Sequence, residues 1–284
     1  MILLQFATFF FNRKSLSSKL ISSGEYLIHM NIILLQTDIA WQEPETNRNH
    51  VEGLIDPLPE STDLIVLPEM FTTGFCTFPK GVAEKADTET LLWMQSIALR
   101  RDMALAGSIA IEENGNYYNR FYFVKPDGSY VTYNKRHLFT FAGEDKEYAA
   151  GQDRVIVEYN GFRILLQICY DLRFPVYSRN KGDYDMILYV ANWPTVRLYA
   201  WNTLVRARAI ENVCYVAAVN RTGNDPDNEY SGGTALYDFM GKPIAEAGIG
   251  EEAVNGTIGM QELTDFRKKF PALQDADKFN MLMR

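Results

Sequence analysis

Short apolar runs alternate with segments of helical periodicity from residue 30 to the end of this 284-residue chain. The apolar run Leu64–Leu67 is followed by the helical pattern Thr88–Arg101, which indicates a strand and then a helix. This alternation is typical of α/β folds, in which helices pack outside sheets and share a hydrophobic core with them. No linker, internal repeat or low-complexity stretch interrupts it. We therefore predict a single α/β domain that spans residues 30–284.

The pattern also predicts which side chains are buried. Strands are expected at Met103–Ile111 and Tyr117–Val124, and further buried strands at Phe162–Ile168 and Asp185–Ala191. The first helix is expected to present one face made of Leu91, Leu92, Gln95, Ala98 and Leu99. A second helix, Trp201–Asn212, is expected to keep its arginines outside a buried stripe made of Trp201, Leu204, Val205 and Ala209.

The first 29 residues do not fit this alternation. Met1–Phe11 is apolar, but no basic segment precedes it and no convincing small-residue cleavage site follows, so it matches a secretory signal poorly. A second methionine, Met30, stands directly before the strand-like run Asn31–Gln36. We predict that residues 1–29 are an N-terminal extension outside the fold, and that the domain begins at residue 30.

Composition excludes several kinds of partner. The net charge of -8 argues against nucleic acid, because phosphate binding requires clustered lysine and arginine. No apolar run is long enough to span a bilayer, so no membrane association is expected. Three histidines, His29, His50 and His137, show no metal-ligand spacing, and we predict no metal site.

The cysteines indicate a reducing environment. Cys76, Cys169 and Cys214 are odd in number and widely spaced, which argues against a disulfide framework and favours the cytoplasm. Cys214 lies in the apolar run Val213–Val219 and is expected to be a buried core residue.

Three positions combine reactive side chains with the ends of apolar strands. Cys169 follows a buried strand, and Pro175 is a plausible first helical residue, so Cys169 lies on a strand-turn-helix elbow. Such an elbow lifts a side chain out of the sheet, and a helix N-terminus nearby favours the thiolate. Glu69 closes the strand Leu64–Leu67, and Lys135 follows the strand Tyr130–Tyr133. Taken singly, each has a commoner explanation: a buried structural cysteine, an exposed loop acid and a solvated charge.

Taken together, three segments resemble the nitrilase superfamily of carbon-nitrogen hydrolases. They are Leu67–Phe71, Tyr133–Phe139 and Cys169–Pro175, which occur in the order and spacing of that family. The similarity runs from about Asn31 to Phe279. Two further segments, Ala207–Asn212 and Ser231–Thr234, are also similar to the family. The elbow Cys169–Pro175 combined with Ala191–Pro194 resembles the omega-amidase branch.

The resemblance implies both a fold and a set of roles. The fold is an α-β-β-α sandwich that dimerises into an extended four-layer sandwich. The resemblance implies Cys169 as nucleophile, Glu69 as general base, Lys135 as stabiliser of the oxyanion, and Glu144 as a second glutamate that positions the site. It implies no cofactor. The residues that it suggests for substrate binding are Tyr170, Arg173, Asn192 and Trp193.

The expected reaction is hydrolysis of the side-chain amide of a small dicarboxylic acid monoamide through a cysteine thioester. The leading substrates are 2-oxoglutaramate and 2-oxosuccinamate, which would give 2-oxoglutarate or oxaloacetate and ammonia. An N-carbamoyl amino-acid hydrolase or a deaminated-glutathione amidase remains open as an alternative, and a true nitrilase fits the elbow less well. Two other classes also remain: a Cys-His hydrolase that uses His137, and a non-catalytic binding protein on the same scaffold.

Overall fold

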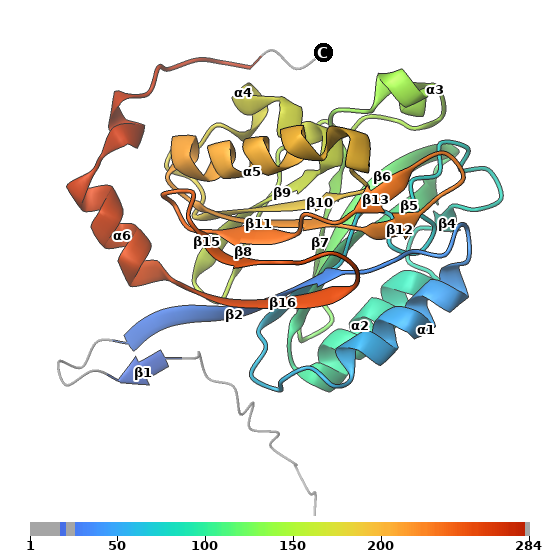
Figure 1. Cartoon of the computed structure of the whole chain (residues 1–284), viewed down its shortest axis with the longest axis horizontal. Coiled ribbons are helices and arrows are strands. Elements are labelled where there is room, and N and C mark those ends of the chain that lie inside the picture. Colours follow the sequence, from blue (N-terminus) through green and yellow to red (C-terminus); the bar gives the residue numbers. More distant parts are fainter. Residues whose placement is uncertain (1–17, 21–25, 282–284) are drawn as a thin grey trace, which may run out of the picture.

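The molecule is a sandwich of four layers, with helices on the two outer faces and two β-sheets between them (Figure 1). The computed structural model describes residues 18–20 and 26–281. The predicted α-β-β-α arrangement is therefore confirmed. The longest described helix, α5 (Leu198–Asn212), has 15 residues, and no helix in the described ranges is long and apolar enough to cross a membrane.

The first sheet is built around β2 and β5 and is covered on its outer face by α1 and α2 (Figure 1). The order is β1-β2-β3-β5-β6-β7, with β16 on β2 and β4 on β5; β2, β3 and β5 run parallel, whereas β6 and β7 run antiparallel to their neighbours. The bounds of its elements are β1 Ser18–Leu20, β2 Tyr26–Gln36, α1 Pro44–Ile55, β3 Leu64–Val66, β4 Glu84–Lys85, α2 Glu89–Arg101, β5 Ala104–Glu113, β6 Asn116–Val124, β7 Tyr130–Asn134 and β16 Glu252–Gly259.

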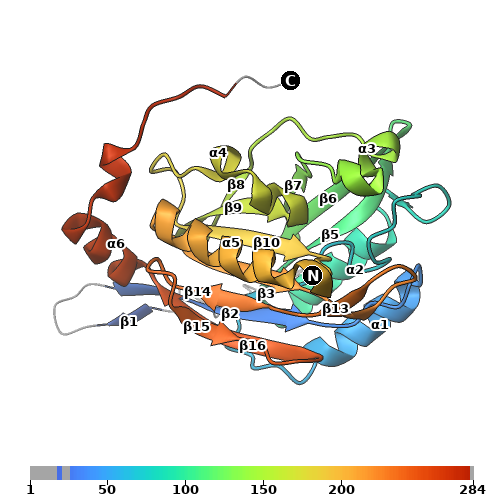
Figure 2. The ribbon, with the colours of Figure 1, turned by 45° about the horizontal axis from the view of Figure 1, so that its top comes forward.

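The second sheet has the order β15-β14-β11-β10-β9-β8, and its three central strands, β9, β10 and β11, run parallel. Helix α5 lies along its outer face (Figures 1 and 2). The bounds of its strands are β8 Ile156–Tyr159, β9 Phe162–Ile168, β10 Met186–Ala191, β11 Tyr215–Asn220, β14 Ala235–Tyr237 and β15 Pro243–Glu246.

Short elements connect the sheets or flank them. A two-stranded ribbon, β12 with β13, stands apart from both sheets, and α6 lies at the opposite end of the molecule from α3 (Figures 1 and 2). The bounds are η1 Thr140–Ala142, α3 Glu144–Glu147, η2 Cys169–Arg173, α4 Pro175–Ser178, η3 Thr195–Arg197, β12 Thr222–Asn224, β13 Glu229–Ser231, α6 Met260–Lys269 and η4 Ala272–Asp275.

Three apolar layers hold these elements together. In β9, Ile164 and Leu166 point into the layer between the two sheets, whereas Leu165 points into the layer under α5. The third layer lies between the first sheet and its two helices, where Ile33 and Ile97 are buried. A strand that is buried on both faces is apolar on both, which is why Phe162–Ile168 is largely apolar, with Arg163 and Gln167 as its polar residues.

The predicted apolar face of α2 was partly wrong. Leu91 and Ala98 are buried as expected, but Leu92 is 61% exposed and Leu99 is 69% exposed. Met94 and Ile97 are buried in their place. Successive residues of a helix are rotated by about 100°, so a stripe assigned one position too far turns outward.

The prediction that the arginines of α5 lie outside its buried stripe was wrong for Arg208. Trp201, Val205 and Ala209 are buried as expected, but only 3% of Arg208 is exposed. Its Nη2 donates a hydrogen bond to the Leu172 carbonyl oxygen at 2.5 Å. A charged side chain can be buried where such a bond satisfies it, and hydropathy patterns do not reveal that partner.

The first described residues belong to the first sheet. Strand β2 begins at Tyr26, and His29 pairs with Gly259 of β16, so the strand extends beyond the predicted domain start at residue 30. Ile28 packs against the layer between the sheets, and β1 pairs with the start of β2. The rest of the predicted extension, residues 1–17 and 21–25, lies outside the described residues.

Candidate active site

Cys169 stands at a sharp change of chain direction directly after β9. Its φ is +43°, a left-handed conformation that non-glycine residues rarely adopt, and it begins the short 3-10 helix η2. Pro175 is the first residue of α4, so the predicted strand-turn-helix elbow is confirmed. Met70, the residue after Glu69, has a φ of +42°. Backbone strain of this kind collects at functional sites, where the surrounding structure enforces it.

The buried carboxylate of Asp171 holds the elbow in place. It accepts hydrogen bonds from the Ile168 N–H at 2.9 Å, the Tyr133 hydroxyl at 2.7 Å and the His137 N–H at 3.0 Å. The His137 Nδ1 also lies 2.8 Å from Asp171 Oδ1, and its ring stacks on Phe174 at 3.9 Å. Within the described residues no hydrogen bond joins His137 to Cys169, which removes the support for a Cys-His hydrolase.

Two buried glutamates share one buried lysine beside Cys169. The Lys135 Nζ lies 2.8 Å from Glu69 Oε1 and 3.0 Å from Glu144 Oε2, and all three side chains are fully buried. These residues come from separate elements: Glu69 follows β3, Lys135 follows β7, and Glu144 begins α3. The structure thus brings together the four residues for which catalytic roles were predicted.

The surroundings of Cys169 disfavour its thiolate form. Burial raises the pKa of the Cys169 thiol well above its ordinary value, the charge of Glu69 raises it further, and the charge of Lys135 opposes both. Burial and the charge of Glu69 therefore oppose the thiolate that we expect a helix N-terminus to favour. The helix that begins here is a single short 3-10 turn.

Lys135 keeps its charge despite its burial. Burial alone would lower the pKa of the ammonium, but the charges of Glu144 and Glu69 hold it above its ordinary value. Burial raises the pKa of Glu144, and the charge of Lys135 opposes this effect. A permanent positive charge therefore lies beside a neutral thiol.

Two asparagines fix the orientation of the Glu69 carboxylate. Asn119 Nδ2 donates to Glu69 Oε1 at 2.8 Å, and the Asn192 N–H donates to Glu69 Oε2 at 2.8 Å. Asn192 Nδ2 also donates to the Glu69 carbonyl oxygen at 2.5 Å. Asn192, which we predict to bind substrate, uses its N–H and its Nδ2 on Glu69, whereas its Oδ1 has no hydrogen-bond partner among the described residues. Asn119 was missed, although an asparagine inside the apolar strand β6 is unusual enough to be a signal.

A cavity of about 370 Å³ opens at Cys169. Its lining includes Cys169 and Lys135 together with all four predicted substrate-binding residues, whereas Glu69 and Glu144 lie behind the wall. Much of the remaining wall is aromatic, from Trp41, Phe75, Phe78, Phe139, Phe141 and Tyr230. Cys169 and Asn192 lie at the carboxyl ends of β9 and β10, the edge where α/β sheets usually place ligands.

The sequence profile of the carbon-nitrogen hydrolase family matches residues 31–268. The chain belongs to this family. The match covers most of the domain and includes every residue of the Glu69, Lys135 and Cys169 group, so the predicted family and enzyme class are confirmed.

Relatives of this carbon-nitrogen hydrolase include amidases. It is 44% identical to the omega-amidase YafV of Yersinia enterocolitica, over 89% of this chain and 99% of the relative. It is 35% identical to the 2-oxoglutaramate amidase of Bacillus subtilis (strain 168), over 87% of this chain and 97% of the relative. A CN-hydrolase superfamily protein of Xanthomonas campestris, solved with an arsenic adduct in its active site, shares 44% identity and a TM-score of 0.87 over 89% of this chain and 99% of its own.

The other two cysteines of this carbon-nitrogen hydrolase lie in different surroundings: Cys76 lines the same cavity as Cys169, and Cys214 lies in the core. In the described ranges, no group of three or more histidine, cysteine, aspartate or glutamate side chains could hold a metal ion. Cys76 and Cys214 are buried free thiols, and Cys214 lies in the apolar layer under α5, as predicted. Of the three cysteines, Cys169 alone lies on the strained turn beside Lys135 and Glu69.

Proposed function

We propose that this carbon-nitrogen hydrolase is an omega-amidase, which converts small dicarboxylic acid monoamides such as 2-oxoglutaramate and 2-oxosuccinamate to the diacid and ammonia. The observation that carries the proposal is the group of Cys169, Lys135 and Glu69 at one small cavity. The named activities of the two amidase relatives support the substrate class.

In the acylation half-reaction, the Cys169 sulfur attacks the amide carbonyl carbon. A neutral thiol is a weak nucleophile, so Glu69 takes its proton as the carbon-sulfur bond forms. The Lys135 ammonium and the Tyr170 N–H stabilise the negative charge on the carbonyl oxygen. Loss of one such donor typically raises the barrier by about 3–4 kcal/mol. Glu69 then gives its proton to the departing nitrogen, and ammonia leaves a thioester on Cys169.

In the deacylation half-reaction, Glu69 takes a proton from water, whose oxygen attacks the thioester carbonyl carbon. The carbon-sulfur bond breaks, the acid leaves and the proton returns to the sulfur. Glu144 contributes by holding Lys135: its two carboxylate oxygens lie 3.0 and 3.1 Å from Nζ, which fixes the ammonium at the wall of the cavity.

An ammonia-release assay across several substrate classes tests this function. We expect the highest kcat/KM for the two 2-oxo acid monoamides, and lower values for N-carbamoyl amino acids, deaminated glutathione and nitriles. Cys169→Ala should fold normally and lose turnover, and mass spectrometry should find the acyl adduct of a slow substrate on Cys169. An adduct on Cys76 or Cys214, or a preference for carbamoyl compounds, would overturn the proposal.

We also propose that two copies associate through the α5 face and that the protein works in the cytoplasm. Several apolar side chains on this side of the molecule are exposed, at Val176 (55%), Val196 (84%), Tyr199 (86%) and Ile210 (51%). Covering them with a second copy would remove an unfavourable contact with water. Light scattering tests the association, and Tyr199→Asp should weaken it. The free cysteines support a reducing compartment.

A further inference from the structure

Two arginines in the cavity differ from the others in the described part of the chain. Arg173 and Arg197 both line the cavity that contains Cys169. Every other arginine in residues 26–281 donates at least one guanidinium hydrogen bond to a protein oxygen. No such bond and no ion pair involves the guanidinium of Arg173 or Arg197 within those residues. The N–H donors of these two guanidinium groups are therefore available to a ligand in the cavity.

Aromatic rings hold both guanidinium groups against the cavity wall. The Arg173 guanidinium carbon lies 4.9 Å from the centre of the Trp193 ring, and that of Arg197 lies 5.3 Å from the centre of the Phe139 ring. Trp193 Nε1 also donates a hydrogen bond to the Arg197 carbonyl oxygen at 2.8 Å. The ring that contacts Arg173 is therefore bonded to the backbone of Arg197. Contact with a ring face leaves the N–H donors at the edge of a guanidinium free to bind a planar acid.

Phe139 links Arg197 to two residues around Cys169, because it contacts all three. The Phe139 N–H donates to Glu144 Oε2 at 2.6 Å, and the Phe139 ring lies 5.0 Å from that of Tyr170, the residue after the nucleophile. Arg197 and Cys169 therefore border the same cavity. Its volume of about 370 Å³ suits a small ligand such as a dicarboxylic acid monoamide.

Two carboxylates also line this cavity, and neither pairs with these arginines in the described structure. Asp225 accepts hydrogen bonds from the N–H groups of Asp227 and Asn228 at 2.8 and 2.7 Å, so it stabilises its own loop. Asp227 is exposed at the mouth. The guanidinium groups are therefore not neutralised by ion pairing from within the cavity.

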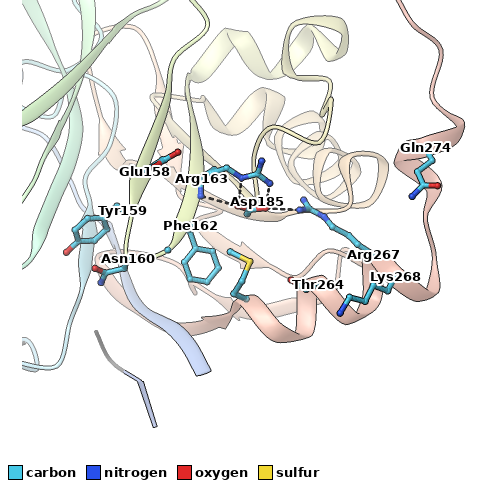
Figure 3. Close-up of a pocket in the computed structure, with 12 residues that line it drawn as sticks. Glu158, Tyr159, Asn160, Phe162, Arg163, Asp185, Thr264, Arg267, Lys268 and Gln274 are labelled. Carbon is cyan, nitrogen blue, oxygen red and sulfur yellow. Dashed lines mark hydrogen bonds and ion pairs between the residues drawn. The ribbon is translucent and has the colours of Figure 1, made fainter. Parts of the chain in front are cut away.

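A larger cleft of about 790 Å³ provides a contrast. It lies between α6 and the start of β9, the strand end opposite Cys169 (Figure 3). Its arginines, Arg163 and Arg267, both bind Asp185, at 2.8 and 2.7 Å (Figure 3). These two guanidinium groups already have a carboxylate partner, whereas the two beside Cys169 have none.

We infer that Arg197 is a specificity-determining residue, which binds the carboxylate end of the substrate together with Arg173. The inference rests on the proposed function and adds Arg197 to Arg173, which the sequence already suggests for substrate binding. One guanidinium group binds the carboxylate through two parallel hydrogen bonds. The other binds the remaining carboxylate lone pairs or an adjacent 2-oxo oxygen. A neutral amide of the same length gains nothing from either arginine.

Paired substrates test this role. We expect Arg197→Met to lower kcat/KM for 2-oxoglutaramate and glutaramate roughly 10- to 100-fold, mainly through KM, and to change butyramide hydrolysis by less than about twofold. Arg197→Lys should restore part of the loss, because it keeps the charge without the fork. The matched control is Arg100→Lys on the exposed surface of α2, which should change neither. Equal losses for acidic and neutral amides would make Arg197 a brace for Phe139 and overturn the inference, as would no loss at all.

A binding measurement separates this inference from the proposed function. The Cys169→Ala protein should bind 2-oxoglutarate in titration calorimetry, and adding Arg197→Met should raise the Kd roughly 10- to 100-fold. An unchanged Kd would overturn the role of Arg197 even if the enzyme were an omega-amidase. If the wild type released no ammonia from the acidic amides, the proposed function would fail, and a raised Kd would still establish Arg197 as a carboxylate ligand.

Discussion

At the scale of single residues, the proposed mechanism depends on a base that takes the proton of the Cys169 thiol. Glu69 has its carboxylate oxygens oriented by Asn119, Lys135 and the Asn192 N–H. Glu69→Gln keeps the outline of this network but removes the proton acceptor, so kcat should fall at least roughly a hundredfold with the fold unchanged. Steady-state ammonia release and circular dichroism measure both. Near-normal turnover in Glu69→Gln, with abolition in His137→Ala, would revive the Cys-His mechanism.

The protonation state of Cys169 gives a prediction of its own. A raised pKa means less thiolate at any given pH, so alkylation by iodoacetamide should be slow at pH 7 and should still be rising above pH 9. Mass spectrometry of Cys169 across this range measures the rate, and Cys169→Ala supplies the background. A rate that levels off below pH 7 would indicate a thiolate formed in advance and would contradict the resting state described above.

At the scale of elements, the elbow between β9 and α4 depends on one buried acid. Asp171 accepts hydrogen bonds from three donors around the turn, including the Ile168 N–H. Asp171→Asn replaces one acceptor oxygen by an NH₂ group that faces donors, so we expect the free energy of unfolding to fall by about 1–3 kcal/mol and kcat to fall as the turn relaxes. Urea unfolding measures the first effect. Stability and turnover equal to those of the wild type would mean that the turn holds without Asp171.

Sequence patterns predicted the strand and the helix start of the elbow well, because both depend on residues that are close together in the chain. The strand Phe162–Ile168 and the helical proline at Pro175 were both placed correctly. The buried face of α2 was misassigned by one position, because apolar residues lie on both sides of its stripe. Asn119 is unusual for a strand, but periodicity could not predict its partners, because Glu69 and Glu144 lie 50 and 25 residues away in the chain. Polar contacts between distant segments leave no periodic trace in a sequence.

At the scale of the whole molecule, the start of β2 contributes to the sandwich beyond the predicted boundary. A chain that begins at Met30 loses the half-buried Ile28 and its contact with the layer between the sheets. We expect its melting temperature to drop by about 2–4 °C, which corresponds to about 1 kcal/mol, and its activity at 25 °C to stay unchanged. A chain that begins at Tyr26 is the matched control. If both starts melt together with the full chain, residues 26–29 add nothing to stability.

The buried guanidinium of Arg208 has a consequence for the molecule as a whole. It bonds from the inner face of α5 to the carbonyl of Leu172, three residues after Cys169 along the chain, while Tyr199 and Ile210 on the same helix face solvent. Helix α5 therefore has one face in water and, through Arg208, a direct hydrogen bond to the turn that carries Cys169. A displacement of α5 would act on that hydrogen bond and hence on the turn.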